Sequence, residues 1–138
     1  MMEYQLQVTL KKIEVLNSNI KSSKIIASLT QGDCTKRIAN PRFIRNRMGS
    51  FYLERLTVST HEISEANRTV SISLRQALLQ IWAIQNSGEE EEIGSVDLDV
   101  AQLVKEAEKT STKAESHRCQ LENIILEFDT LVSVKKNQ

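Results

Sequence analysis

The length, composition and charge of the chain limit the protein to a small set of classes. Its 138 residues suit one domain that buries its own core without needing a metal or a disulfide. The chain has 18 basic residues (lysine and arginine) and 18 acidic residues (aspartate and glutamate), so its net charge is zero. Attraction to nucleic acid or lipid through the total charge is therefore excluded. Only 4% of the residues are aromatic, so aliphatic side chains must carry the core.

Alternating apolar and polar residues predict that the chain opens with a half-buried strand over residues 4–15. The apolar positions change from even to odd numbers after Lys11 and Lys12, so the core-facing side of the strand flips there. We therefore expect a β-bulge at these lysines. The apolar residues before and after it are Leu6, Val8, Leu10, Ile13 and Val15.

A β-hairpin is predicted next. Residues 24–30 form its first strand and residues 34–39 its second. Gln31-Gly32-Asp33 is a tight turn between them, because glycine accepts a positive φ and aspartate favours turns. Asn40-Pro41 ends the hairpin, since proline lacks the amide hydrogen that a sheet ladder needs. A basic loop over residues 42–50 follows.

The second half of the chain alternates predicted strands with polar segments and contains the one predicted helix. Asp99 caps this helix over residues 100–109, with an apolar stripe of Val100, Leu103, Val104 and Ala107. Residues 106–117 are so polar that we expect a mobile loop there. The predicted strands are residues 51–59, 69–74, 78–84 (where strand is favoured over helix), 93–100 and 123–134, with a polar, acidic turn over residues 86–92.

Seven or eight short strands separated by turns are typical of a sandwich or barrel, and their order resembles a C2 domain. The resemblance rests on the threonine–basic pair Thr35-Lys36, the step Asn40-Pro41, and the strand from Leu79 to Ile84 that is followed by a polar turn and Ile93-Gly94. It implies a mainly β protein. The whole chain, residues 1–138, would be a single C2-like antiparallel β-sandwich of about eight strands with one short helix.

Calcium-binding C2 domains hold the cation with several loop aspartates, because hard cations need clustered oxygen ligands. In this chain the loop over residues 17–23 has no acidic residue, and Ala83, Gln85 and Asn86 stand where the family places aspartates. The resemblance therefore implies a calcium-independent domain, and we expect neither a metal nor a cofactor.

A basic stretch is the first candidate binding surface. Residues 34–53 contain no acidic residue, and five basic residues lie among them: Lys36, Arg37, Arg42, Arg45 and Arg47. Such a cluster suits an acidic protein surface or anionic phospholipid, and it also suits a solvated loop whose charges balance acids elsewhere. Nucleic acid is disfavoured, because few aromatic residues are available for base stacking.

An acidic tip is the second candidate surface, and it consists of Glu89, Glu90, Glu91 and Glu92. Such a run is usually a solvated turn. As a functional element it would contact a basic partner, or the basic stretch of a second copy. Trp82 is the only tryptophan, and we expect it in the core rather than on a binding platform.

Catalysis finds no support in the sequence. His61 and His117 have no nucleophile at a suitable spacing, and four glycines in total make no phosphate-binding loop. Cys34 and Cys119 are expected to be reduced thiols, with a disulfide as the alternative.

These observations predict a noncatalytic protein-interaction or scaffolding module in a larger assembly, cytoskeletal or ciliary in kind. The alternative is a peripheral membrane module that binds anionic phospholipid through the basic stretch without calcium. The amino terminus does not resemble a signal peptide, and no apolar run of about 20 residues occurs. We therefore expect a cytoplasmic protein, associated with the cytoskeleton or with a membrane.

Overall fold

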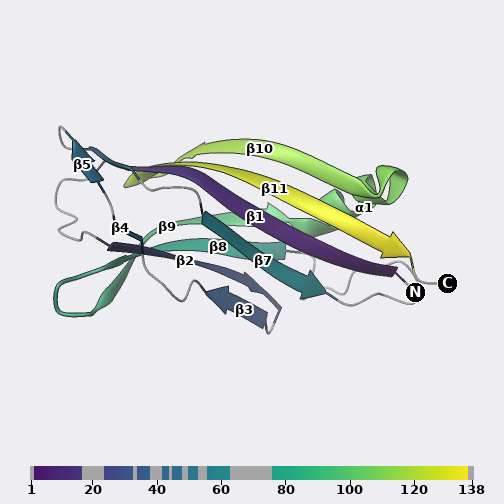
Figure 1. Cartoon of the computed structure of the whole chain (residues 1–138), viewed down its shortest axis with the longest axis horizontal. Helices are drawn as coiled ribbons and strands as arrows, with labels where there is room; N and C mark the ends of the chain where they lie inside the picture. Colours follow the sequence, from purple (N-terminus) through teal and green to yellow (C-terminus); the bar gives the residue numbers. More distant parts are fainter. Residues whose placement is uncertain are drawn as a thin grey trace.

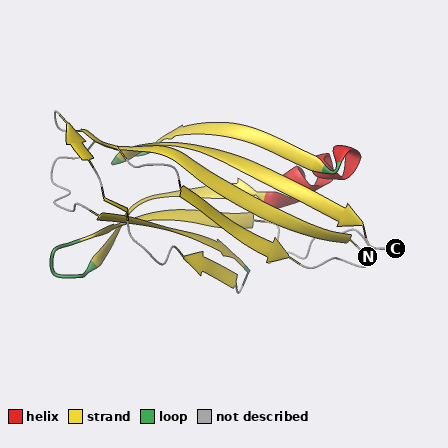
Figure 2. Ribbon diagram, in the orientation of Figure 1, coloured by secondary structure: helices red, strands yellow, loops and turns green. Residues whose placement is uncertain are grey.

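The computed structural model describes residues 2–16, 24–32, 34–37, 42–43, 45–47, 50–52, 56–62 and 76–136. Most of them belong to strands, and the strands form two antiparallel sheets that lie face to face (Figure 1). One helix occurs among the described residues, at one end of the two sheets (Figure 2). The predicted mainly β class and the antiparallel sandwich are therefore confirmed.

Sheet A is built around its two longest strands, β1 (Met2–Val15) and β11 (Ile124–Lys136), which pair with each other from end to end. β10 (Thr112–Gln120) forms the edge of the sheet beside β11. On the other side of β1 lie β7 (Leu56–Glu62) and, farther along, β6 (Ser50–Tyr52). β6 pairs in turn with the short strand β5, whose bounds are Arg45–Arg47.

Sheet B has the order β3-β2-β8-β9, with bounds Cys34–Arg37, Lys24–Gln31, Gln76–Ile84 and Glu90–Asp99. The short strand β4 (Arg42–Phe43) pairs with the start of β2. β2 and β3 form the predicted hairpin, and Gly32 in its turn has the positive φ of 58° that favours glycine. The predicted strand over residues 78–84 is also confirmed, because β8 contains it.

The bulge predicted at the two lysines is confirmed. The register between β1 and β11 shifts between Leu10 and Lys12, so Lys11 is the extra residue. Leu10 before the shift and Ile13 after it are both buried against the core. The apolar face of β1 therefore stays on the inside even though its residue numbers change from even to odd.

The core lies between the two sheets, and its apolar side chains among the described residues are aliphatic apart from one ring. Alternate residues of β1, β2, β8 and β11 point into it, as period-two strands require. Phe128 of β11 supplies the ring and is 1% exposed. The other large side chains that are fully buried are Leu6, Leu10, Ile13, Ile25, Leu29, Leu79, Ile81, Ile124, Leu126, Gln31 and Val8.

The predicted helix is confirmed as α1 (Val100–Thr110). Asp99 is its N-cap, and the backbone N–H of Gln102 donates a hydrogen bond of 3.1 Å to the Asp99 carboxylate. The predicted apolar stripe is the buried side of the helix, and its members are Val100, Leu103, Val104 and Ala107. Ser111 ends the helix in the left-handed conformation, with a φ of 72°.

Two predictions about the middle of the chain are wrong. The basic stretch after Pro41 is not a plain loop, because it contains β4 and β5 and is followed by β6, which starts at Ser50. The single strand predicted over residues 51–59 is divided between β6 and β7, which pair with different parts of β1. Both errors have one cause: strands of two or three residues are set by the partner edge that is available, and they are too short to show a period.

The predicted mobile loop over residues 106–117 is also wrong. Its first residues complete α1, and the remainder form most of β10. No residue of β10 is fully buried, because exposed and half-buried side chains alternate along it. Backbone pairing with β11 therefore holds this strand, and its sequence lacks the apolar alternation that would have indicated it.

The acidic turn is shorter than predicted. Gln85 to Glu89 make the turn, and Glu90 to Glu92 already belong to β9, opposite the end of β8. The predicted loop over residues 17–23 and the predicted strand over residues 69–74 lie outside the described residues.

Replacing Gly94 with alanine is expected to lower the free energy of unfolding by about 1–3 kcal/mol, the usual cost of overpacking. A Cβ at this position would lie 2.6 Å from Cδ1 of Ile124 and 3.0 Å from Cδ1 of Leu121. Ile124 is fully buried, so its side chain has little space to move. Urea denaturation measures the loss. The variant Ile124→Val lacks Cδ1, so an equal cost of Gly94→Ala in that background would contradict a clash as the cause.

Candidate functional site

The outward surface of sheet B is the candidate site, and the strand register identifies its residues. On β8, Ala77, Leu79, Ile81 and Ala83 face the core, so the residues between them face outward. Direct cross-strand partners share a face, which places Ile26, Ser28 and Arg37 on the same side as Trp82. We call this surface the Trp82 face, and its members are Ile26, Ser28, Arg37, Gln80, Trp82, Glu90 and Glu92.

Trp82 lies on this face and not in the core, so the prediction of a core tryptophan is wrong. Its ring is half-buried, and its indole Nε1–H donates a hydrogen bond of 3.1 Å to the hydroxyl of Ser28. Ile26, the residue opposite Trp82 on β2, is 6% exposed although it points outward. The tryptophan therefore presents one partly open aromatic surface and has its polar atom already bonded to the protein.

The predicted basic and acidic surfaces meet on the Trp82 face. The guanidinium of Arg37 forms an ion pair with the carboxylate of Glu90. Arg37 belongs to β3 and Glu90 to β9, the two edge strands of sheet B, so the ion pair spans the face from one edge to the other. The Arg37 side chain is 45% exposed and that of Glu90 is 35% exposed, so both remain open to solvent and to a partner.

The other acidic residues are only partly engaged. The amide of Gln80 donates to Glu92 at 3.1 Å, and that of Gln85 donates to Glu91 at 3.4 Å. Glu89 lies in the turn and is exposed. Three neighbouring carboxylates at the start of β9 thus face amide groups and one arginine, a mixed polar border rather than a cation cage.

The five predicted basic residues are divided between the two sheets. Lys36 and Arg37 are exposed on β3, and Arg42 belongs to β4 on the same edge of β2. Arg45 and Arg47 belong to β5 in sheet A. The side chains of Arg42, Arg45 and Arg47 lie outside the described residues, so their part in a common surface stays a prediction.

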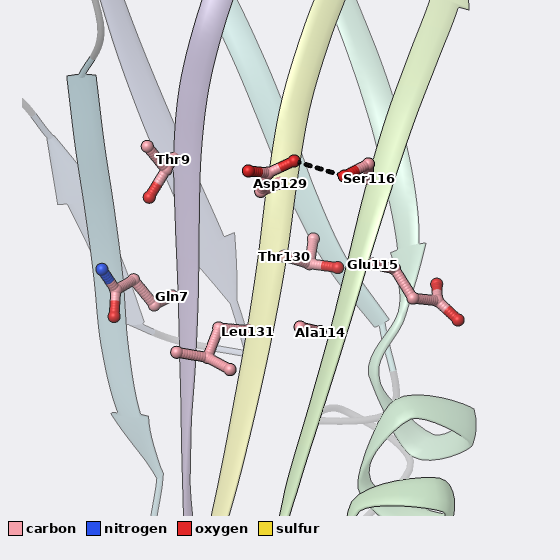
Figure 3. Close-up of a pocket in the computed structure, with 8 residues that line it drawn as sticks. All are labelled: Gln7, Thr9, Ala114, Glu115, Ser116, Asp129, Thr130 and Leu131. Atoms are coloured by element: carbon pink, nitrogen blue, oxygen red, sulfur yellow. Dashed lines mark hydrogen bonds between the residues drawn. The ribbon is translucent and has the colours of Figure 1, made fainter.

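A shallow hollow of about 320 Å³ lies on the outward surface of sheet A, across β1, β11 and β10 (Figure 3). Ser116 donates a hydrogen bond of 2.8 Å to Asp129, and the ammonium of Lys11 lies 3.0 Å from the same carboxylate. His117 follows Ser116 on the strand, and its ring stacks on the buried Phe128 on the opposite side of the sheet. The imidazole that could serve as a base therefore faces away from the Ser116 hydroxyl.

The described residues contain few other side chains suited to catalysis or to metal binding. Among them, no three histidine, cysteine, aspartate or glutamate side chains gather closely enough to hold a metal ion. Cys119 is a free, half-buried thiol on β10. Within the same part of the chain, no helix is both long enough and apolar enough to cross a bilayer.

Comparison with known proteins finds chains of similar structure among the solved structures. No protein-family model and no curated protein matches the chain. A C2 domain structure is similar over 96% of this chain and 99% of the other, with a TM-score of 0.54 and 10% identity. A C2 domain of plant extended synaptotagmin 1 is similar over 96% of each chain, with a TM-score of 0.59 and 9% identity. At such identities the likeness concerns the fold alone, and it shows that the chain folds as a C2-like antiparallel β-sandwich.

Proposed function

We propose that this protein is a noncatalytic C2-like module that binds another protein through the Trp82 face and the basic edge beside it. The observation that carries the proposal is a partly exposed tryptophan beside an exposed arginine on one sheet surface. Tryptophan and arginine dominate the binding energy of protein interfaces, where they are surrounded by polar residues that exclude water. Ile26 lies opposite Trp82 on β2, and the hydrogen bond to Ser28 fixes the orientation of the ring.

The charges of this face also favour a protein partner. Basic groups on β3 and acidic groups on β9 border the tryptophan on opposite sides, as in the polar rim of a protein interface. We expect the partner to carry an apolar anchor for Trp82 together with an acidic segment directed toward Arg37. A module of this kind suits a scaffolding role in a larger assembly, cytoskeletal or ciliary in kind, in the cytoplasm.

The alternative is calcium-independent binding of anionic phospholipid through the same basic residues. The acid-free stretch over residues 34–53 favours it, because basic residues near an anionic membrane contribute roughly 1 kcal/mol each. The ion pair between Arg37 and Glu90 opposes it, since a carboxylate on the same face reduces the attraction to lipid phosphates. We therefore place protein binding first.

A charge-neutralised variant separates the two proposals. Lys36, Arg37, Arg42, Arg45 and Arg47 are replaced together by glutamine, and a control variant replaces the exposed Lys105 and Lys109 of α1. We expect wild-type protein to leave phosphatidylserine vesicles in the supernatant at both low and high salt, with or without millimolar calcium. Proteins captured from a native lysate by the wild type and the control should be lost from the variant.

The outcome of each arm is distinct. Salt-sensitive sedimentation of the wild type with the vesicles, absent in the neutralised variant, would establish the lipid alternative and remove the protein proposal. If protein binding holds, kinetics with the captured partner should show slower association for the variant and a weaker dependence on salt, because exposed charges act mainly on the rate of encounter.

A further inference from the structure

The outer edge of β10 is a long row of backbone groups that no other described strand pairs with. β10 is the terminal strand of sheet A, and among the strands that the structure describes only β11 pairs with it. Its nine residues pair with β11 without a register shift, so the strand is regular along its length. In such a strand half of the amide and carbonyl groups point away from the sheet and are ready to bond a further strand.

The edges of sheet B carry features that prevent pairing, whereas β10 does not. β9 has a register shift near its start and three consecutive glutamates, Glu90 to Glu92, which would repel the same strand of another copy. β3 is only four residues long. β10 has neither a bulge nor a proline, and the exposed residues at its centre, Ala114 and Ser116, are small. Small side chains leave the backbone edge open to a neighbouring strand.

The charges on the inward side of β10 are already compensated inside the chain. Glu115 lies 3.9 Å from the ammonium of Lys113 and 3.7 Å from Nε2 of His117. Lys113 also lies 3.8 Å from Glu106 of α1. An inward-pointing charge usually protects an edge by repulsion. Here Lys113 and Glu115 have opposite signs and neutralise each other, so they do not oppose the approach of a second strand.

We propose that β10 pairs antiparallel with β10 of a second copy, so that sheet A continues from one protomer into the other. The partner is a copy of this chain because the sequence of the strand complements itself. In the register that uses all nine residues, the two-fold axis passes through Ser116. Glu115 then lies opposite the partner's His117, and Ala114 lies opposite the partner's Arg118. Each of these pairs occurs twice, as an isologous interface requires.

Neighbouring registers are less favourable. In a continuous sheet, directly opposed residues must share a face, so the axis can move only by whole residues along β10. An axis through Glu115 places this carboxylate opposite the same carboxylate of the partner, and an axis through His117 removes the contact between Glu115 and the partner's His117. Like charges directly opposite each other destabilise a strand pair, whereas an imidazole N–H can donate a hydrogen bond to an opposite carboxylate. The register centred on Ser116 avoids the repulsion and keeps the full length of the ladder.

The β10 edge and the Trp82 face lie on different sheets, so the strand pair does not depend on the proposed function. Sheet B takes no part in the pairing, and both copies keep their Trp82 faces. A dimer would present two such faces to one assembly, and two linked sites bind more tightly than one without any new contact.

Two substitutions at one exposed position test the pairing. Ala114→Glu places a carboxylate opposite the partner's Arg118 twice, and Ala114→Arg places two guanidinium groups there instead. We expect the dimer dissociation constant, measured by sedimentation equilibrium, to fall roughly two- to thirty-fold for Ala114→Glu and to rise by a similar factor for Ala114→Arg. The same two changes at the exposed Gln102 of α1 serve as controls and should leave it unchanged.

A wild type that remains monomeric up to its solubility limit would overturn the proposal. So would changes of the same sign for both Ala114 variants, because opposite charges at a position facing Arg118 must act in opposite directions. Disulfide formation provides a second measurement. Ser116→Cys should give a covalent dimer under mild oxidation, since opposed residues of an antiparallel pair lie within disulfide range. Gln102→Cys should not, and equal dimer yields from the two variants would count against the register.

Discussion

Replacing Phe128 with alanine should destabilise the protein by about 3–5 kcal/mol, a large share of the stability of an ordinary domain. Phe128 is 1% exposed and is the largest of the fully buried side chains among the described residues. It lies on β11, between β10 and β1, and its ring stacks on His117 of β10 with a centroid distance of 4.7 Å. Its removal therefore leaves a cavity between the sheets and also takes away the support for the edge strand.

Urea denaturation of the wild type and the variant measures this loss. Ile125→Ala is the matched control, because Ile125 lies on the same strand but its half-buried side chain points away from the core. We expect the control to cost much less. Equal losses for the two variants would mean that the ring contributes no more to the core than a surface side chain does.

The second large effect is expected on partner binding. Trp82→Ala should weaken binding of the captured protein by at least about 2 kcal/mol, or roughly 30-fold in the dissociation constant, as for a central tryptophan of an interface. The ring is half-buried and its N–H is bonded to Ser28, so it offers area to a partner with little loss of side-chain freedom. Isothermal titration calorimetry with the purified partner provides the value.

Two further variants keep this result interpretable. Leu16→Ala removes another apolar side chain, 42% exposed and outside the Trp82 face, and should leave the affinity unchanged. Trp82→Phe keeps an aromatic ring but loses the hydrogen bond to Ser28, so an intermediate affinity is expected. A well-folded Trp82→Ala protein that binds as tightly as the wild type would remove the Trp82 face from the proposed function.

The elements with a buried side were predictable from the sequence because burial leaves a period. The bulge at Lys11 follows from the change of apolar face in β1, and the helix follows from Asp99 and the stripe behind it. β10 has no fully buried residue, because exposed residues on its outward face alternate with half-buried residues on the face toward the core, and its pairing with β11 is a matter of backbone hydrogen bonds. No alternation of apolar residues could have indicated it.

The candidate site was harder to predict than the fold. In β8 both faces carry apolar residues, so alternation alone does not decide which side of the strand Trp82 occupies. The pairing of β8 with β2 decides it, because Ala83 and Ile81 take the core positions. The contact between Arg37 and Glu90 depends likewise on the order of strands in sheet B, which joins residues far apart in the chain. The basic and the acidic residues were both identified from the sequence, but the contact between Arg37 and Glu90 was not predicted.

The central ladder of sheet A has a consequence for how the protein acquires its structure. β1 pairs with β11 from Met2 opposite Lys136 to Val15 opposite Ile124, so the first and the last of the described strands pair with each other. Closing so long a loop costs entropy before its contacts form, and folds dominated by such pairings form in milliseconds to seconds rather than microseconds. During synthesis on the ribosome, the backbone edge of β1 that pairs with β11 remains without this partner until β11 has emerged.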